Sequence, residues 1–512
     1  MAIKLNSRNV ANDLASVGMD VDRGSGSKRN LNARKRIQSV LPLSCVLGMW
    51  GLCMASSPAP SVGPAIVVNT LWEIPLGADY ATTAVSSERD AHPPFLALFY
   101  IPGSSTDVAG HALPGVQLLY RLLNSNASDH MDSLTAGEGG LQTEGPLGYA
   151  WSKGTSEFGL SPIVRMYNTQ SQSPNAGDHA TAVEVAPIPH PQALPTYHPE
   201  GPIGYGYARY PGTDNVLAWQ TGGAVTVKSN LAVGCALWEW WWNGLQFVND
   251  YDYGRQMQVA LYPLDGSSAL GEAGDAWGLP DIAVDARHPS PCVTFATGTS
   301  PSGPYQTTAA VPLDWSPQSF GGGADNPVIY PSVRLGKTIT LDWIGPDNID
   351  RNWPVALFQT NIQTPSNSPG ISDAFIETPT GYLNAQFNTY YYYNPATQAL
   401  TQVLASTVGS AGYNVPLPAS GPQAVILASG TSPTSPAMGV YINNPGSGMT
   451  FYDNSSGLST GQYGSNFVKW GALYRGPVPA GTWTYNTWVM TDTRQNVIAY
   501  MNQLYTWGVV SR

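Results

Sequence analysis

The sequence predicts an all-β protein, in which a large β-sandwich domain follows a smaller β module built from repeats. Only 11% of the 512 residues are charged, whereas the chain holds 54 glycines and 43 prolines. Such a composition favours short strands joined by turns over helices stabilised by i,i+4 ion pairs. Apolar and polar residues alternate at 225–233 and 257–261, which is the period of a half-buried strand. The hydrophobic content of 42% is enough for a large core.

The region 215–512 is predicted to be one domain made of many strands. Thr493 begins the only segment with helical spacing, 493–504, where Val497, Met501 and Leu504 recur on one face. Many short strands in one domain of this size indicate a large sandwich or a barrel. We predict strands at 225–227, 256–262, 292–296, 332–341, 355–359, 383–393, 424–428, 439–442, 467–473 and 483–490.

The N-terminal segment 1–55 is predicted to direct export. Eight of the 23 basic residues lie in 1–36, and the last three, Arg34-Lys35-Arg36, precede an apolar stretch that ends in small residues near Ala55. This order is typical of a signal peptide cleaved after about residue 55. An uncleaved anchor is the alternative, and it would be the protein's one attachment to a membrane. Residues 56–68 are predicted to be a linker, and the protein is expected to be secreted or periplasmic.

Charge and cysteine content narrow the partners of the exported part. Residues 56–512 carry 15 basic and 31 acidic residues, a net charge of −16, so nucleic acid is excluded as a partner. Cys235 and Cys292 form either one disulfide or buried free thiols. Neither the cysteines nor the histidines have metal-site spacing, so we expect no metal and no cofactor. Esterase, zincin and nucleotide-binding motifs are absent from the sequence.

An internal repeat occupies 69–214. Arg121 and Asn124 recur as Arg165 and Asn168 at a spacing of 44. An Asp-His pair follows in both copies, at 129–130 and 178–179, and then an EGPxGY motif, at 144–149 and 200–205; a degenerate third copy starts at Asp79. This order of motifs resembles repeats of unknown function appended to secreted bacterial hydrolases. Three such copies predict a small pseudo-threefold β module that binds a ligand. We expect His130 and His179 to fix turns and not to bind metal.

The C-terminal region resembles the galactose-mutarotase-like supersandwich shared by sugar epimerases, glycoside hydrolases and polysaccharide lyases. GGAV at 222–225, WNG at 242–244 and FVN at 247–249 are similar to the opening of that domain, and AGTWTYNTW at 480–488 is similar to its closing strand. The region looks still more like a group of secreted bacterial proteins without an established activity. The resemblance implies a β-supersandwich over 215–512 and leaves the chemistry open. The segments that carry this closer likeness are DYGRQMQ at 252–258, RLGK at 334–337, ETPTGYL at 377–383 and KWGALY at 469–474.

A polar run, 249–256, lies beside four tryptophans at 238–242 and supplies the first candidate site. Aromatic rings stack on sugars, while carboxylates, arginine and glutamine bond to hydroxyls. Some of the tryptophans must be core, so the functional interpretation falls mainly on the polar run. The predicted substrate-binding residues are Asp250, Tyr251, Tyr253, Arg255, Gln256, Trp242 and Tyr382.

The favoured hypothesis is a secreted, carbohydrate-active protein that hydrolyses a polysaccharide. Hydrolysis needs two carboxylates, one protonated and one ionised. Glu239 is among the acids present, but we assign catalysis to Asp252 and Glu377, with His288 as the one histidine of 215–512. Glu377 precedes Pro379 and is expected in a loop at the start of a new strand. The alternatives are a non-catalytic glycan-binding or cell-surface protein and a polysaccharide lyase. Two carboxylates in one aromatic cleft would favour hydrolysis, whereas carboxylates that are scattered or each tied to an arginine would favour binding.

Overall fold

The structure is a computed structural model, and it is described over a defined set of residues. The predicted export segment 1–55 lies outside this set. The described residues are 65–76, 79–93, 96–125, 128–152, 160–168, 178–183, 197–209, 217–250, 256–264, 270–271, 289–314, 326–366, 370–410, 412–415, 421–444, 447–456 and 466–511.

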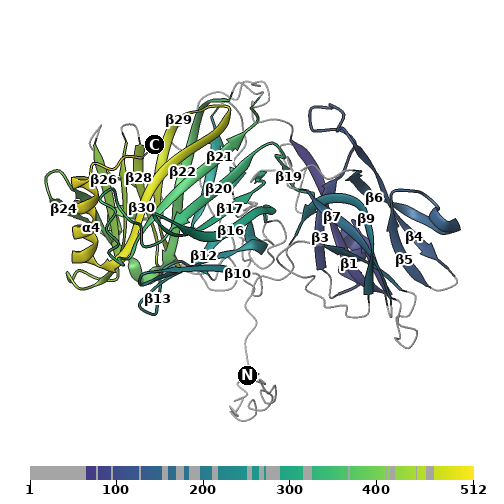
Figure 1. Ribbon diagram of the computed structural model, residues 1–512, viewed down its shortest axis with the longest axis horizontal. Coiled ribbons are helices and arrows are strands. Elements are labelled where there is room, and N and C mark those ends of the chain that lie inside the picture. Colours follow the sequence, from purple (N-terminus) through teal and green to yellow (C-terminus); the bar gives the residue numbers. More distant parts are fainter. Residues whose placement is uncertain are drawn as a thin grey trace, which may run out of the picture. The chain divides into compact units, whose positions relative to one another are not determined.

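The N-terminal strands form three similar units. In each unit the first strand pairs antiparallel with the two strands that follow it: β1 with β2 and β3, β4 with β5 and β6, and β7 with β8 and β9. The middle strands β2, β5 and β8 contact one another, and Figure 1 labels the other strands of these units together with β5. The elements are β1 (Ile66–Leu76), β2 (Asp79–Thr83), α2 (Ser86–Ala91), β3 (Leu96–Pro102), β4 (Val116–Asn124), β5 (Asp129–Ser133), η1 (Glu138–Gly140), β6 (Gln142–Trp151), β7 (Ser161–Asn168), β8 (His179–Val183) and β9 (Tyr197–Ala208).

Two large antiparallel sheets follow in the chain. Sheet I has the strand order β19-β18-β15-β14-β22-β29-β28-β25, and β1 pairs with its strand β19. The bounds in sheet I are β14 (Gln258–Pro263), β15 (Leu270–Gly271), β18 (Leu313–Asp314), β19 (Val328–Ile329), β22 (Ile371–Asn384), β25 (Tyr413–Asn414), β28 (Ser447–Asn454) and β29 (Phe467–Val478).

Sheet II has the strand order β16-β17-β20-β21-β30-β27-β26-β23-β24. Its bounds are β16 (Cys292–Ser300), β17 (Gly303–Ala310), β20 (Arg334–Thr340), β21 (Val355–Thr364), β23 (Thr389–Asn394), β24 (Ala399–Val403), β26 (Pro422–Ala428), β27 (Pro436–Asn443) and β30 (Gly481–Thr493). The short helices α3 (Ala405–Val408) and η6 (Ala385–Phe387) lie in connections.

Sheets I and II share one apolar core. Ile376 and Trp470 of sheet I and Phe358 and Val440 of sheet II belong to the same buried cluster. Burial of side chains on alternate positions of facing strands is what stabilises a sandwich. The predictions of an all-β protein and of a large supersandwich are therefore confirmed.

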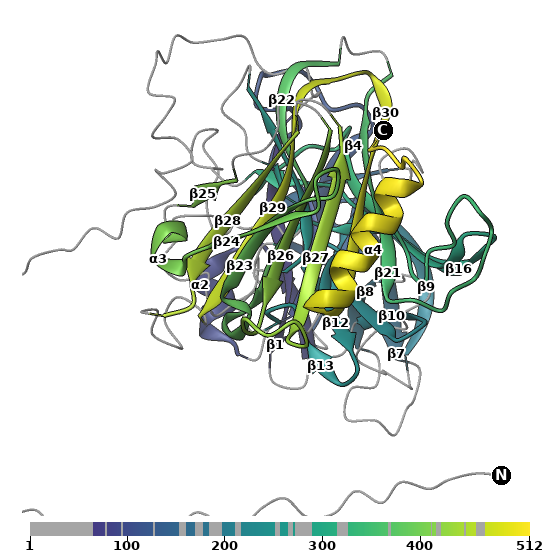
Figure 2. The same ribbon diagram turned by 90° about the vertical axis from the view of Figure 1, so that its left-hand side faces the viewer.

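Helix α4 (Arg494–Thr506) covers the outer face of sheet II. It confirms the predicted helix, and Val497, Met501 and Leu504 are buried against Tyr391 and Trp488. Figure 2 shows α4 lying along the strands, and it contacts β26, β27 and β30. Sheet II is thus covered on both faces at these strands.

The four consecutive tyrosines at 390–393 lie on strand β23, where alternation leaves two on each face and one pair could have stacked on sugars. In the structure Tyr390 lies in the shared core and Tyr391 and Tyr393 lie under α4. The predicted single strand 383–393 is wrong. The chain leaves sheet I at Asn384, passes through η6 and enters sheet II as β23.

A four-stranded sheet contains the tryptophan-rich segment. It consists of β10 (Leu217–Gly222), β11 (Val225–Asn230), β12 (Ala236–Trp242) and β13 (Leu245–Gln246). The short helix η3 (Leu231–Val233) connects β11 to β12. Its inner face joins the shared core through Val227 and Trp240, and Trp240 Nε1 donates to Thr491 Oγ1 at 3.0 Å.

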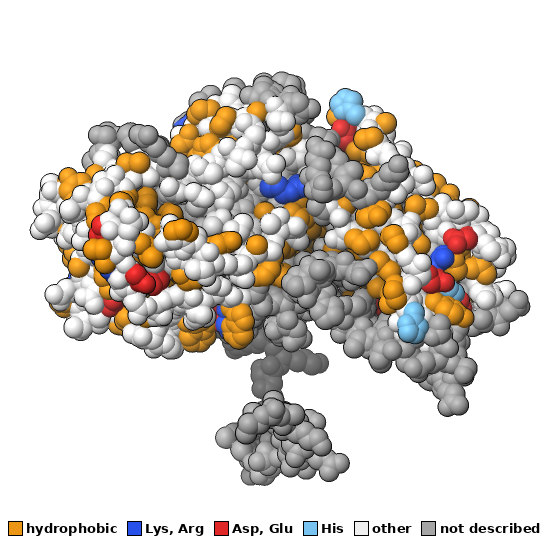
Figure 3. Space-filling view, viewed as in Figure 1, with side chains coloured by type: hydrophobic (Ala, Val, Ile, Leu, Met, Phe, Trp, Pro, Cys, Tyr) orange, Lys and Arg blue, Asp and Glu red, His pale blue; other side chains and the backbone are white. Residues whose placement is uncertain are grey.

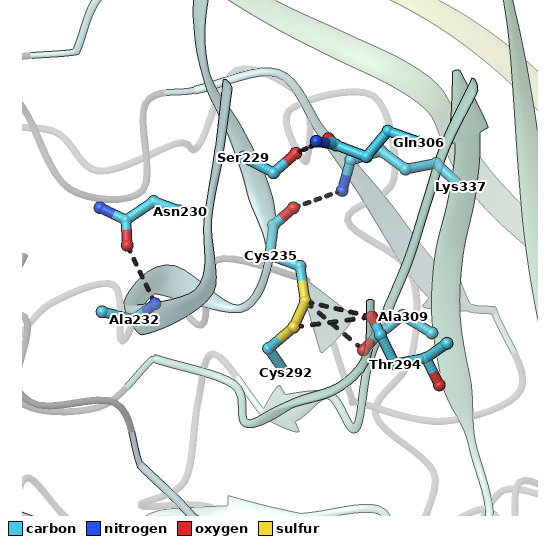
Figure 4. The surroundings of a disulfide bond; sticks show 9 residues. All are labelled: Ser229, Asn230, Ala232, Cys235, Cys292, Thr294, Gln306, Ala309 and Lys337. Carbon is cyan, nitrogen blue, oxygen red and sulfur yellow. Dashed lines mark hydrogen bonds between the residues drawn. A yellow bond between two sulfur atoms is a disulfide. The ribbon is translucent and has the colours of Figure 1, made fainter. Parts of the chain in front are cut away.

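A disulfide between Cys235 and Cys292 joins the four-stranded sheet to strand β16 of sheet II (Figure 4). The two Cα atoms are 5.3 Å apart and 57 residues apart in the chain. Lys337 is fully buried in the same place, and its Nζ donates to the backbone oxygen of Cys235 at 2.7 Å. Of the two states left open by the sequence, the structure has the disulfide.

The described helices include none that is both long and apolar enough to span a membrane. Strand β1 begins at Ile66 and pairs with β19 through Ile66 and Val67, so the end of the predicted linker 56–68 is strand.

Replacement of Cys235 and Cys292 by serine is expected to lower the free energy of unfolding by about 2–4 kcal/mol. The bond closes a loop of 57 residues in the unfolded chain, and its removal restores the conformational entropy of that loop. Urea unfolding of the oxidised, reduced and doubly substituted proteins measures the difference. Equal midpoints for the oxidised and reduced wild type would contradict the prediction.

Candidate functional site

A buried ion pair lies on the outer face of sheet I. Val468 and Trp470 point into the shared core, so Lys469 between them points to the opposite side of β29. Its Nζ lies 2.9 Å from Glu377 Oε1 on β22. The same Nζ lies 4.7 Å from the ring centre of Tyr382 and 5.2 Å from that of Tyr452.

The electrostatics of this cluster prevent Lys469 and Tyr452 from acting as bases at neutral pH. Burial opposes a charge on Lys469, but Glu377 and the two tyrosines outweigh it and raise the pKa of the ammonium group. Burial, the strongest influence on Tyr452, raises the pKa of its phenol although Lys469 lowers it. Lys469 therefore stays cationic and Tyr452 stays neutral, and neither accepts a proton from a substrate.

The structure brings several predicted site residues to this face and buries them. Gln256 and Tyr382 are both buried, and the backbone N–H of Asn249 donates to the backbone carbonyl oxygen of Tyr382 at 2.9 Å. Glu377, which we expected in a loop before a new strand, is buried inside β22. A buried carboxylate that is paired with a lysine inside a sheet has a structural role.

The other predicted residues divide between described and undescribed parts of the chain. Trp242 is half-buried and packs edge-on against Phe247, with ring centres 6.5 Å apart. Asp250 is half-buried and belongs to the outer face of the four-stranded sheet. The residues outside the described set are Tyr251, Asp252, Tyr253, Arg255 and His288.

The outer face of the four-stranded sheet carries a second group of aromatic and charged side chains. Trp219, Lys228 and Glu239 are cross-strand neighbours on β10, β11 and β12. Lys228 Nζ lies 2.7 Å from Glu239 Oε2 and 5.1 Å from the ring centre of Trp219. The Trp219 side chain is 65% exposed, which is unusual for so large an apolar group.

Trp241, Gln246 and Asp250 extend this group. Trp241 Nε1 also donates to Glu239 Oε2, and Trp241 is paired with Gln246 of β13. Burial raises the pKa of Asp250, and the Glu239 carboxylate raises it further, against the lowering effects of Gln246 and Lys228. We call these six residues the Trp219 face: Trp219, Lys228, Glu239, Trp241, Gln246 and Asp250.

Alternation of side chains along β11 and β12 predicts part of this face. Val225 and Val227 point inward, so Lys228 points outward, and along β12 the inward Trp240 leaves Trp241 outside. Glu239 was considered among the acids, but the strand pairing that unites it with Trp219 depends on a β-bulge between Lys228 and Ser229.

The repeat module carries a separate set of polar contacts. Corresponding arginines make corresponding bonds: Arg121 Nε to Glu144 at 2.7 Å, and Arg165 Nε to Glu200 at 2.7 Å. Figure 3 shows acidic, basic and histidine side chains close together on the part of the surface over this module. The residue at the corresponding position of the first unit is Glu73, in place of an arginine.

Glu73 is a buried acid, 3% exposed, and neither of its carboxylate oxygens has a hydrogen-bond partner. It lines a small pocket together with His130, Asp132 and Thr181. Burial, and then the Asp132 carboxylate, raise the pKa of Glu73 from 4.5 to about 7.

Comparisons with known proteins give distant likenesses of fold. No protein-family model matches the chain, and a search of curated proteins found no match. A galactose mutarotase related enzyme from Lactobacillus acidophilus is similar at 9% identity and a TM-score of 0.34, over 55% of this chain and 99% of that chain. An alpha-N-acetylgalactosaminidase from Bifidobacterium bifidum, in complex with GalNAc, is similar at 10% identity and a TM-score of 0.32, over 56% of this chain and 38% of that chain. A 4-alpha-glucanotransferase from Thermococcus litoralis is similar at 8% identity and a TM-score of 0.24, over 55% and 40% respectively.

Lys469→Met is expected to lower the free energy of unfolding by about 3–5 kcal/mol, because it leaves the Glu377 carboxylate buried without its cation. The double variant Glu377→Gln, Lys469→Met removes both charges and should be more stable than Lys469→Met alone. A double-mutant cycle from urea unfolding measures the coupling. Additive losses would show that the two side chains do not interact.

Glu73→Gln is expected to change how stability depends on pH. The folded protein binds a proton at Glu73 up to pH about 7, whereas the unfolded chain releases it near 4.5. The free energy of unfolding therefore falls as pH rises through this window, by up to about 3 kcal/mol from this group. Unfolding curves from pH 4.5 to 8 measure the slope, which should be flatter in Glu73→Gln than in the wild type. Parallel slopes would contradict the prediction.

Proposed function

We propose that the chain is an extracytoplasmic glycan-binding protein and that the Trp219 face is its binding surface. The observation that carries this proposal is the largely exposed indole of Trp219 next to the Lys228–Glu239 ion pair. An aromatic plane flanked by fixed polar groups suits a sugar, which has an apolar ring face and a rim of hydroxyls.

Each member of the face has a role in this proposal. The Trp219 indole stacks on a sugar ring. Lys228 Nζ has three N–H donors, of which one points at Glu239, so the others are available to hydroxyl oxygens. Asp250, which is half-buried at the same face, accepts from hydroxyls, whereas Gln246 Oε1 accepts from the backbone N–H of Trp240 and holds β13 against β12.

Binding is favoured over catalysis because two of the described candidate acids, Glu377 and Glu239, are paired with lysines. Glu377 pairs with Lys469, and Glu239 pairs with Lys228. A carboxylate that must attack carbon or activate water needs a free oxygen directed at the substrate, whereas the second oxygen of Glu377, Oε2, is buried. Lyase chemistry is supported less, since Lys469 and Tyr452 have raised pKa values and do not act as bases.

Hydrolysis of a polysaccharide is the second candidate, and one observation favours it. Burial, and then the Glu239 carboxylate, raise the pKa of Asp250, and a carboxylic acid with a raised pKa is the usual proton donor of a glycosidase. Asp252, Glu377 and His288 keep the catalytic roles predicted from the sequence as part of this second candidate.

A secreted or periplasmic location is part of the proposal. The apolar segment after Arg36 has the order of a signal peptide, and a buried disulfide persists in an oxidising compartment. Both features suit a protein that meets a polysaccharide outside the cell.

A glycan array with the purified full chain tests the proposal. Trp219→Ala should weaken binding to the best glycan by about tenfold or more, a loss of about 1.4 kcal/mol, because the stacking surface is removed. Tyr505→Ala is the matched control, since Tyr505 is an exposed aromatic (39%) on α4, outside the face. Calorimetric titration gives the Kd values, and unfolding curves check that both variants fold.

The same glycans incubated with wild type, Asp250→Asn and Asp252→Asn separate binding from hydrolysis. Products released by the wild type and lost in Asp250→Asn would favour the second candidate. Equal Kd values for wild type and Trp219→Ala would place any glycan site elsewhere.

A further inference from the structure

Three aspartates meet in the repeat module. Asp79, Asp129 and Asp178 occupy corresponding positions in the three units, at or next to the start of β2, β5 and β8. One ligand oxygen of each lies within 4.8 Å of the others, and all three residues are buried. Of the Arg, Asp and His positions of the repeat, only the Asp is present in all three units, because the first has Glu73 and Tyr80 instead.

Two oxygens of this cluster have no hydrogen-bond partner. Asp79 Oδ1 and Asp178 Oδ1 are fully buried and unpaired, on side chains that are only 7% and 5% exposed. A buried acceptor without a partner is destabilising and rare in folded proteins. These orphan atoms are an observation separate from the closeness of the three residues, and a bound cation would satisfy them.

The other oxygens of the cluster are held from outside. The backbone N–H of His130 donates to Asp79 Oδ2 at 3.2 Å, and Nδ1 of the same residue contacts that oxygen. His179 contacts Asp129 through its backbone N–H at 2.8 Å and through Nδ1 at 2.7 Å, and Tyr197 donates its hydroxyl to Asp178 Oδ2. Such an outer set of donors orients carboxylates that bind a metal ion.

We propose that Asp79, Asp129 and Asp178 bind one calcium ion between the three units of the repeat module. The donor set consists only of carboxylate oxygens, which hard cations prefer. The three ligand atoms lie within 4.8 Å of one another, so a point between them is no more than about 2.8 Å from each, which brings them within reach of the Ca–O distance of about 2.3–2.6 Å. Magnesium keeps several of its waters, so a buried set of carboxylates suits it less well.

The cation would act as a clamp on the module. β2, β5 and β8 each supply one ligand, so the ion connects all three units, none of which buries a complete core alone. A proton shared between carboxyls is the rival explanation, because burial and then the neighbouring carboxylates raise the pKa of Asp178 to about 8.

Calcium titration of the full chain, stripped with a chelator and held at a pH of about 8.5, tests the proposal. We expect one ion per chain by calorimetry and a rise in Tm of about 3–6 °C at about 1 mM Ca²⁺. Magnesium at the same concentration should give a smaller rise. Asp129→Asn and Asp178→Asn should lose both responses.

Glu73→Gln is the matched control. It removes a buried carboxyl from the same module without touching the three aspartates, so its calcium response should equal that of the wild type. If the aspartate variants do not fold, native mass spectrometry of the wild type still counts the bound ions. A wild type without heat, bound ion or Tm change at about 5 mM Ca²⁺ would overturn the proposal in favour of the shared proton. Full calcium binding by folded Asp129→Asn and Asp178→Asn would also overturn it.

Discussion

Sheets I and II press one face each into a common apolar core, and the rest of the large domain depends on how their remaining surfaces are covered. The outer face of sheet II lies under α4. The inner face of the four-stranded sheet adds Val227, Leu237 and Trp240 to the common core. Its outer face does not pack against the core, so polar and aromatic side chains can lie there together.

Scarce charge shapes the chemistry that is left. With 11% charged residues, each buried charge needs a partner nearby, since desolvation of a lone ion would outweigh the stability of a domain. Glu377 finds Lys469, and Lys337 finds a backbone oxygen. The same contacts that satisfy these buried charges make them unsuitable for acid–base catalysis. For this reason the glycan-binding hypothesis is preferred to a catalytic one.

The class of fold and many strands could be predicted because period-two alternation and turn composition are local properties. Val497, Met501 and Leu504 likewise predicted α4 from their spacing alone. The Trp219 face could not be predicted in full, because it depends on which strands pair and on a bulge after Lys228. Glu377 shows the same limit: sequence neighbours suggested a loop, whereas its lysine lies 92 residues away.

The pairing of β1 with β19 has a consequence for how such a protein can be divided. Ile66 and Val67 bond to Val328 and Ile329, so the first strand of the repeat module also completes an edge of sheet I. A gene fragment that begins after the repeat module would encode a sheet with a bare edge, and bare edges recruit other strands and aggregate. The pairing of these four residues therefore favours keeping the repeat module and the large domain together. This applies to natural recombination and to the design of gene fragments in the laboratory.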